Sequence, residues 1–318
     1  MTSSNTIPGG VTIRPITGAD EIALFNRLPY TINHELADDL VVRRRRPEWM
    51  WVALHGDRVL ARVAWWGRAG DSTPLLLDIL DIEDGAEDLT EVAQALYETA
   101  AKQVVPSGAT PPEYGRFLPA DWREDPDTYQ AVRRRMGVLE NTGAHLTVER
   151  LRLEWRPGAD LPAPDGRLAF RPALDTDELV ALMTRTLDGT LDAHSREDLA
   201  QMSPHEAAVK HYEQEFATYS SPRQWWRIGT LGEDGEPVGF VVPARNSYHP
   251  VIAYLGVVPE HRGHGYVDGL LAEGTRILAA EDVPRIRAAT DLGNVPMANA
   301  FARAGYVNFE RAINMAWQ

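Results

Sequence analysis

The spacing of apolar residues in the second half of the chain predicts alternating strands and helices. Apolar runs and period-two alternation predict strands over 168–173, 224–231, 237–243, 250–258, 285–291 and 307–317. Apolar stripes at helical spacing predict helices over about 264–281 and from Met297 to Ala304. Because 250–258 is almost continuously apolar, we expect it to be buried on both faces. The order strand, helix, strand after residue 250 predicts a right-handed parallel crossover inside a mixed sheet.

The first half of the chain repeats this layout. The segment VTIRP at 11–15 opens one half as LAFRP at 168–172 opens the other, and acidic residues that suit a helix start follow each. Four residues near the ends recur after 161 or 162 positions, Gly143, Glu149, Arg150 and Trp155 matching Gly305, Glu310, Arg311 and Trp317. We therefore expect two copies of one α/β (α+β) fold, at 1–156 and 168–318, joined by a proline-containing linker at 157–167.

Composition narrows the classes of function. The 318 residues include 44% hydrophobic residues, enough for two cores, and 46 acidic against 32 basic residues give a net charge of −14. This charge disfavours nucleic-acid and membrane-surface binding. The cluster Arg43–Arg46 lies among acidic residues, so we interpret it as a solvated edge.

With no signal-peptide pattern and no run of 18 apolar residues, we expect a cytoplasmic protein. Lysine occurs only at Lys102 and Lys210, which is typical of a GC-rich bacterial genome.

Cysteine and histidine usage excludes further chemistry. The chain has no cysteine, so disulfides, thiolate nucleophiles and cysteine zinc sites are ruled out. The nine histidines show neither H-x-x-x-H nor H-E-x-x-H spacing, so we expect no metal.

The segment VVPEHRGHG at 257–265 carries the strongest chemical signal. An apolar strand runs into a glycine-containing turn that opens a helix, so unpaired backbone N–H groups and the positive end of the helix dipole face outward beside Arg262. Such a terminus binds phosphate oxygens. Gly263 and Gly265 suit it because a side chain at either position would hold a phosphate away from the backbone.

The same segment, followed by Asn294 and by Gly305-Tyr306, resembles the GNAT superfamily of N-acyltransferases, which use acetyl-CoA or another acyl-CoA. The resemblance is specific over 168–318 and weak over 11–155. The layout is similar to that of tandem members such as mycothiol synthase, whose substrate is not carried over. The positions that the resemblance assigns to CoA are Val257, Val258, Arg262, Gly263, His264, Gly265, Tyr266, Val267, Asn294 and Phe301.

Two positions depart from the family pattern. Val267 stands where the last loop position is usually glycine or alanine. Phe301 stands where many members have a tyrosine that protonates the leaving thiolate, and phenylalanine has no proton to give. Either CoA leaves as a thiolate or another donor, Tyr254 or Tyr306, takes the role.

The resemblance implies direct attack of an amine on the thioester, with a strand N–H polarising the carbonyl and a base removing a proton. The strand before the loop offers no carboxylate, so the polar candidates for catalysis are His249 and Tyr254. Residues of the loop that could line a small-molecule amine site are Asp188, Asp192, His194 and Glu197. Each is also open to interpretation as a solvated or structural residue. Trp225 and Trp226 suit sheet packing better than substrate binding.

The first half lacks the phosphate loop. The end of the apolar segment 74–82 and the residues that follow it include no arginine and only one glycine, Gly85. They include five carboxylates that would repel a diphosphate, Asp81, Glu83, Asp84, Glu87 and Asp88. We therefore expect a degenerate first copy and a catalytic second one, in a monomer or homodimer. The alternative is a protein that binds acyl-CoA without catalysis, as the Phe301 position and the acid-free strand would allow.

Overall fold

The computed structural model describes residues 5–7, 9–85, 89–164, 166–233 and 235–317. Contacts divide the chain into two compact units, one of residues 1–149 and 312–318 and one of residues 150–311. These limits do not coincide with the domain limits expected at 1–156 and 168–318. The reason is that strands β7 (Ala144–Trp155) and β13 (Val307–Trp317) each contribute residues to both units. Linker composition marks where a chain lacks regular structure, but not which core a long strand joins.

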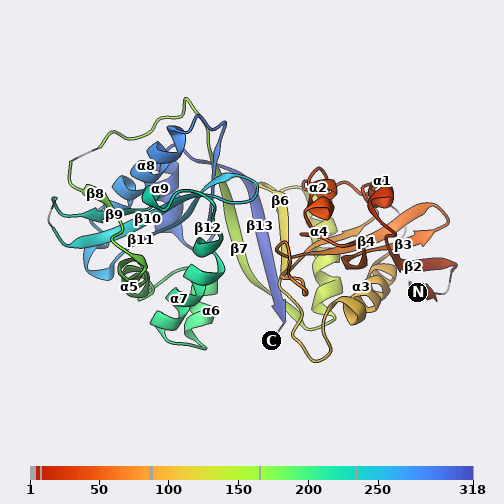
Figure 1. Cartoon of the computed structure of the whole chain (residues 1–318). Helices are drawn as coiled ribbons and strands as arrows, with labels where there is room; N and C mark the ends of the chain where they lie inside the picture. The colour runs from red at the N-terminus through yellow and green to blue at the C-terminus, as the bar shows by residue number, and fades with distance from the viewer. Residues whose placement is uncertain (1–4, 8, 86–88, 165, 234, 318) are drawn as a thin grey trace. The chain divides into compact units, whose positions relative to one another are not determined.

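The first unit is a mixed sheet between two helical layers (Figure 1). Its strands follow the order β1-β2-β3-β4-β5-β6, then β13 and β7. Neighbours from β1 to β5 are antiparallel, and β5 and β6 are parallel with α3 as the crossover. Its further elements are β1 (Asn5–Ile7), β2 (Val11–Pro15), α1 (Ile22–Phe25), α2 (Leu36–Val41), β3 (Met50–His55), β4 (Arg58–Trp66), β5 (Leu76–Ile82), α3 (Thr90–Val104), β6 (Tyr114–Pro119) and α4 (Pro126–Glu140).

The second unit repeats this arrangement (Figure 1). Its strand order is β13-β7-β12-β11-β10-β9-β8, with β11 and β12 as the parallel pair and α8 as the crossover. Helices α5 and α7 pack on one apolar cluster, and α8 and α9 pack on the other. Its further elements are β8 (Ala169–Pro172), α5 (Thr176–Thr186), α6 (Ala193–Leu199), α7 (Pro204–Gln214), β9 (Arg227–Thr230), β10 (Pro237–Arg245), β11 (Pro250–Val257), α8 (Tyr266–Ala279), β12 (Ile286–Asp291) and α9 (Val295–Arg303).

The predicted fold class is confirmed, and two local predictions need correction. The strand expected at 224–231 begins only at Arg227, because Arg223–Trp225 forms a 3-10 turn after Pro222. The strand at 250–257 is not buried on both faces: among its residues only Pro250 and Ile252 are fully buried. The physical reason is that its pairing with β12 is short, which leaves the second half of β11 at an open edge.

One polar motif is built the same way in both units. In the first unit, Arg14 donates two hydrogen bonds to Glu21, at 2.7 and 2.6 Å. In the second unit, Arg171 makes the same two bonds to Glu178, and both glutamates also accept a backbone N–H from the turn before the helix. The equal seven-residue spacing and equal geometry support the internal repeat inferred from the sequence.

The interpretation of Arg43–Arg46 as a solvated edge is wrong for Arg45. Its side chain is 1% exposed and forms ion pairs with Asp39 and Asp78. A buried guanidinium needs such partners because its desolvation is costly. The acidic residues therefore form ion pairs with a buried arginine of this cluster instead of screening its charge at the surface.

Candidate functional site

The turn before α8 holds a run of free backbone N–H groups. Gly263 and Gly265 have φ of 82° and 77°, in the left-handed region that favours glycine. Helix α8 begins after Gly265 with no side-chain cap. Among the described residues, none accepts a hydrogen bond from the backbone nitrogens of 263–267. A Cβ added to Gly263 would meet no atom within 4 Å. Open space and unpaired donors therefore meet at this helix terminus, as phosphate binding requires.

Arg262, one of the residues assigned to CoA, is bonded to the chain itself. Its Nε donates to the backbone oxygen of Val257 at 3.1 Å. Its two terminal nitrogens donate to the backbone oxygens of Asp188, at 2.6 Å, and Thr186, at 2.9 Å. The guanidinium thus ties the end of α5 to the end of β11. Its three contacts are to carbonyls of the chain itself, and this fork geometry suits arginine alone among side chains.

Arg167 is a cation near the turn that sequence reasoning missed. Its Nη1 donates to the backbone oxygen of His264 at 2.7 Å, and its guanidinium lies 5.3 Å from the ring centroid of Tyr266. A Cβ on Gly265 would lie 3.6 Å from its Nη2. The residue belongs to the expected linker, so no motif spacing pointed to it. Val267, the bulkier loop residue, is half-buried in the first turn of α8.

Strand β11 presents an open backbone edge beside the turn. Its pairing with β12 consists of the single pair Val251 and Arg287. On the other side, Val258 N donates to Val238 O at 2.9 Å. In an antiparallel ladder, successive backbone N–H groups of a strand point alternately to its two neighbours. The N–H of Gly256 therefore points toward β10, and the N–H groups of Leu255 and Val257 point toward the open edge. The backbone nitrogen of Val258, one of the residues that the resemblance assigns to CoA, is already paired.

A bulge in β11 turns Tyr254 toward the helices α5 and α7. The register with β10 passes from Tyr254 to Ile252, so Ala253 is the extra residue. Ala253 and Tyr254 therefore pack on the α5 and α7 side, whereas Ile252 packs on the α8 side. Burial raises the pKa of Tyr254 to about 12, although the hydroxyls of Thr186 and Ser195 oppose the rise.

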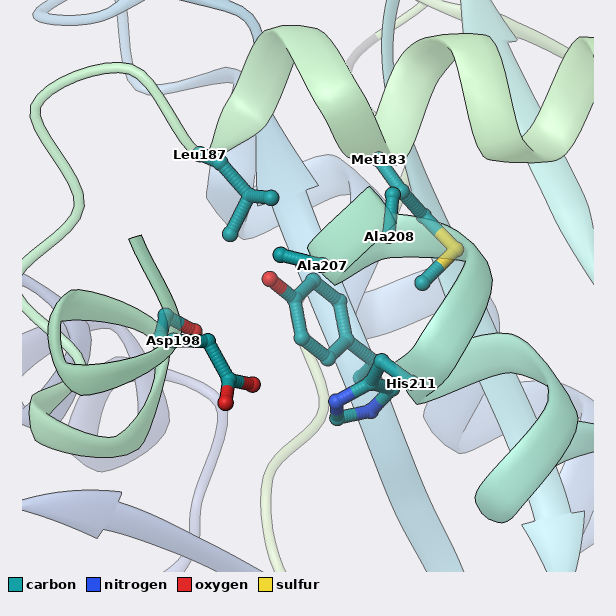
Figure 2. Close-up of a pocket in the computed structure, with 8 residues that line it drawn as sticks. Met183, Leu187, Asp198, Ala207, Ala208 and His211 are labelled. Carbon is teal, nitrogen blue, oxygen red and sulfur yellow. The ribbon is translucent and has the colours of Figure 1, made fainter. Parts of the chain in front are cut away.

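Tyr254 borders a pocket that lies wholly within the second unit. Figure 2 shows apolar side chains of α5 and α7 along one side, and Asp198 of α6 and His211 of α7 along another. The space between these side chains that no protein atom fills is about 260 Å³, and part of it is open solvent. Its lining residues are Met183, Leu187, Ser195, Asp198, Ala207, Ala208, His211 and Tyr254. Its wall is therefore mixed, with a hydroxyl, a carboxylate and an imidazole among apolar side chains.

The residues predicted to bind the acceptor lie beside this pocket and do not line it. Asp192 caps α6 by accepting from Ser195 N, and its other oxygen lies 2.6 Å from Arg150 Nη2. The side chain of Asp188 is exposed. His194 and Glu197 of α6 do not line the pocket. Ser195 and Asp198, three residues apart on the same helix, do line it. The sequence located the helix but not which of its faces turns inward.

His249 is separated from the rest of the site. It precedes β11 and lies five residues before Tyr254, about 16 Å along an extended strand. Burial, and then the charges of Arg287, Arg285 and Arg152, lower its pKa to about 4. Its surroundings are thus cationic, which does not favour the catalytic role expected for it beside an ammonium group.

Three further predicted residues have structural partners. Asn294 caps α9, because its Oδ1 accepts from Met297 N at 3.3 Å. Phe301 is 1% exposed and packs edge-on against Tyr306 in the core, which does not support direct contact with CoA. Tyr306 is also buried, and its hydroxyl lies 2.9 Å from Thr275 Oγ1. Of the two tyrosines proposed as proton donors, only Tyr254 borders the pocket.

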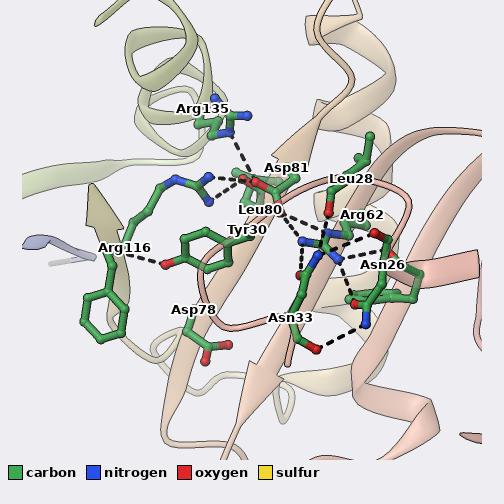
Figure 3. A network of polar contacts seen from close by, with 12 residues as sticks. Asn26, Leu28, Tyr30, Asn33, Arg62, Asp78, Leu80, Asp81, Arg116 and Arg135 are labelled. Carbon is green, nitrogen blue, oxygen red and sulfur yellow. Dashed lines mark hydrogen bonds and ion pairs between the residues drawn. The ribbon is translucent and has the colours of Figure 1, made fainter. Parts of the chain in front are cut away.

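In the first unit, the gap between the corresponding strands is closed by side chains. The parallel pair β5 and β6 is again joined by one pair, Leu77 and Tyr114. Beyond it, Arg116 Nη2 donates to Asp81 Oδ1 at 2.8 Å, and Arg62 Nε donates to Asp81 Oδ2 at 2.9 Å (Figure 3). Arg135 Nε lies 3.5 Å from Asp81 Oδ1. The carboxylate is 1% exposed.

The electrostatics of this cluster correct the expectation for the first half. Burial raises the pKa of Asp81, but the charges of Arg116, Arg62 and Arg135 outweigh burial and lower it. Glu83 pairs with Arg58, and Asp84 pairs with Arg134. The three described carboxylates are therefore paired with arginines and are not a free anionic surface. Glu87 and Asp88, the other two, lie outside the described residues.

The described part of the chain shows neither a cluster of metal-binding side chains nor a membrane-spanning helix. No group of three or more His, Cys, Asp or Glu residues there is placed to hold a metal ion. No helix there has both the length and the apolar character needed to cross a membrane.

Comparison with known proteins gives one family match. Residues 192–306, from the cap of α6 to the start of β13, match the model of the Acetyltransferase (GNAT) family. No curated protein matches the chain.

Solved structures with the same fold include three similar proteins. A GCN5-related N-acetyltransferase from Sphaerobacter thermophilus shares 13% identity over 98% of this chain and 96% of that one, with a TM-score of 0.63. A tandem GNAT protein from the clavulanic acid biosynthesis pathway shares 16% identity over 96% and 98%, with a TM-score of 0.55. A GCN5-related N-acetyltransferase from Kribbella flavida shares 14% identity over 95% of both chains, with a TM-score of 0.50. At such identities the likeness shows the fold.

Proposed function

We propose that the second unit transfers an acyl group, most simply acetyl, from acyl-CoA to the amine of a small molecule, because residues 192–306 match the Acetyltransferase (GNAT) family. The single observation that carries the proposal is the unpaired run of N–H groups at 263–267 beside the open edge of β11. Helix-terminus donors suit the diphosphate, and an open strand edge suits the amide groups of the pantetheine arm.

The residues around the open edge account for polarisation and proton donation. Bound acyl-CoA would supply the activated acyl group. The N–H groups of Leu255 and Val257 are placed to donate to oxygens along that edge and so to favour negative charge on a carbonyl there. The raised pKa of Tyr254 keeps its hydroxyl protonated at neutral pH, so it can donate a proton where the thiolate leaves. Tyr254 can therefore supply the proton that Phe301 cannot give.

The closed gap of the first unit supports assigning the chemistry to the second. Where β11 leaves its edge open, β5 has Arg116, which bonds Asp81 and also reaches Leu80 O at 3.4 Å. Opening this gap would strip a buried carboxylate of its partners, a cost of about 3–5 kcal/mol. We therefore propose that the first unit does not bind CoA between β5 and β6.

Gly265→Asp tests the phosphate site. It places a carboxylate at the helix terminus, and losing two charge-assisted hydrogen bonds of about 1.5 kcal/mol each would weaken CoA binding by about 100-fold. The measurement is calorimetric titration of the full chain with CoA. Gly232→Asp is the matched control, because Gly232 has φ of 78° but lies in the turn after β9. Equal affinities of the two variants would show that the loop does not hold the diphosphate.

Thiol release separates catalysis from binding alone. We expect the parent protein to release free CoA from acetyl-CoA in the presence of at least one amine from a panel of amino acids, amino sugars, polyamines and arylamines. CoA binding without turnover across this panel would instead favour the non-catalytic acyl-CoA-binding protein. That alternative is motivated by Phe301 and by the absence of a carboxylate on β11.

A further inference from the structure

The pocket beside Tyr254 is lined by the imidazole of His211, which lies one helical turn from the carboxylate of Glu215. His211 Nε2 lies 3.2 Å from Glu215 Oε2, at the C-terminal end of α7. The hydroxyl of Tyr219 donates to the other carboxylate oxygen, Oε1. Glu215 is thus held from two sides, and with Nε2 turned to this carboxylate, Nδ1 is the ring nitrogen left to accept a proton.

The position of His211 relates it to the open edge of β11. Its ring packs edge-on against Tyr254, with centroids 5.1 Å apart, and against Phe216, at 4.9 Å. Its side chain is 33% exposed and lines the pocket (Figure 2). These aromatic contacts limit how far the ring can turn, while one side of it stays open to a molecule in the pocket.

The charged groups near His211 include an ionised carboxylate. Burial raises the pKa of Glu215, but the contacts with His211 and the hydroxyl of Tyr219 outweigh burial and lower it, so Glu215 is ionised at neutral pH. From α6, Asp198 faces the pocket with its charge paired to Lys210 Nζ at 2.6 Å. From β11 comes the neutral hydroxyl of Tyr254. A carboxylate thus lies 3.2 Å from one nitrogen of the imidazole ring.

We propose that His211 is the general base for the acceptor amine and that Glu215 positions it and stabilises its protonated form. This inference rests on the proposed acyl transfer. His211 removes one proton from the ammonium, and the freed amine forms a C–N bond as the C–S bond breaks with its electron pair staying on sulfur. The remaining extra proton on nitrogen neutralises the thiolate through Tyr254, and His211 releases its proton to solvent.

Activity as a function of pH provides the first test. With acetyl-CoA and the best amine of the panel above, His211→Gln is expected to lower kcat about 100- to 10,000-fold and to remove the acid limb of the kcat profile. CoA affinity by calorimetry is expected to stay unchanged. Glu215→Gln is expected to cause a smaller loss and to move the acid limb to lower pH, because the anion that favours imidazolium is gone. His205→Gln and Glu213→Gln, exposed on the same helix, are the matched controls.

Imidazole NMR of the full chain provides the second test and needs no acceptor. The His211 signal, identified by its loss in His211→Gln, is expected to titrate, with a lower midpoint in Glu215→Gln and an unchanged one in Glu213→Gln. An unchanged midpoint in Glu215→Gln, or a His211→Gln enzyme with parental kcat and pH profile, would overturn the proposal while acyl transfer stands. No thiol release by the parent protein with any amine would overturn the acyl transfer itself, and the base role with it.

Discussion

Arg262 ties two segments of the second unit together at the scale of single residues. Its hydrogen bonds to the backbone oxygens of Val257, Asp188 and Thr186 connect the end of β11 to the end of α5. Gly256 lies at the same junction: a Cβ there would come within 2.9 Å of Thr186 Cγ2. The shape of the turn before α8 therefore depends on a side chain that points back into the fold.

Arg262→Gln is expected to destabilise the second unit by about 1.5–3 kcal/mol, the range for charge-assisted hydrogen bonds. Urea unfolding followed by tryptophan fluorescence measures the loss. Arg196→Gln is the control, because Arg196 is exposed on α6. If Arg262 instead contacted phosphate, its variant would lose CoA affinity and unfold at the same urea concentration as the control.

The sequence predicted the turn before α8, but not its backbone conformation. Glycine at 263 and 265 was explained by close approach of a phosphate, and the positive φ at both positions adds a second reason for glycine there. The pairing of His211 with Glu215 left no distinctive signal, since an i,i+4 pair of this kind occurs on ordinary helix surfaces. The same limit applies to Arg262, whose long side chain could fold toward or away from the loop.

The Arg–Glu motif recurs at the scale of elements, at the start of each repeat. Its hydrogen bonds from Arg14 lower the pKa of Glu21 to about 2. A carboxyl with a lowered pKa stabilises the fold above its ordinary pKa, near 4.5, and loses that contribution as the pH falls toward 2.

Glu21→Gln should therefore lower the urea midpoint of the first unit at pH 7, with a difference from the parent protein that shrinks as the pH falls from 4.5 toward 2. Unfolding at a series of pH values provides the measurement. Glu178→Gln should show the same trend in the second unit, where Arg171 likewise lowers the pKa of Glu178. A deficit that stays constant below pH 4 would show that these ion pairs do not contribute in the way described.

Elements were more predictable than their edges. Helix α8, expected over about 264–281, spans Tyr266–Ala279, because a long apolar stripe fixes its existence while caps fix its ends. The full burial expected for β11 failed because an apolar sequence does not reveal whether a neighbouring strand continues alongside. In this fold the missing neighbour is what leaves the candidate site open.

At the scale of the whole molecule, the parallel strand pairs of the described residues differ: the gap beside β11 is open, and the gap beside β5 is filled. Both parallel strand pairs are joined by a single residue pair. The first is closed by Arg116 and Asp81, whereas the second exposes backbone groups near Leu255. The sequence indicated this difference through the missing phosphate loop, but the arginines that close the gap come from separate strands and helices, so no local motif revealed them.

Hydrogen exchange of the full chain with and without CoA tests this division of roles most directly. Bound phosphates and a pantetheine arm would occupy the amide groups at 263–267 and near Leu255, so those amides should exchange more slowly, while the amides of β5 and β6 should be unchanged. Slower exchange in β5 and β6, with the rates at 263–267 unaltered, would contradict the account.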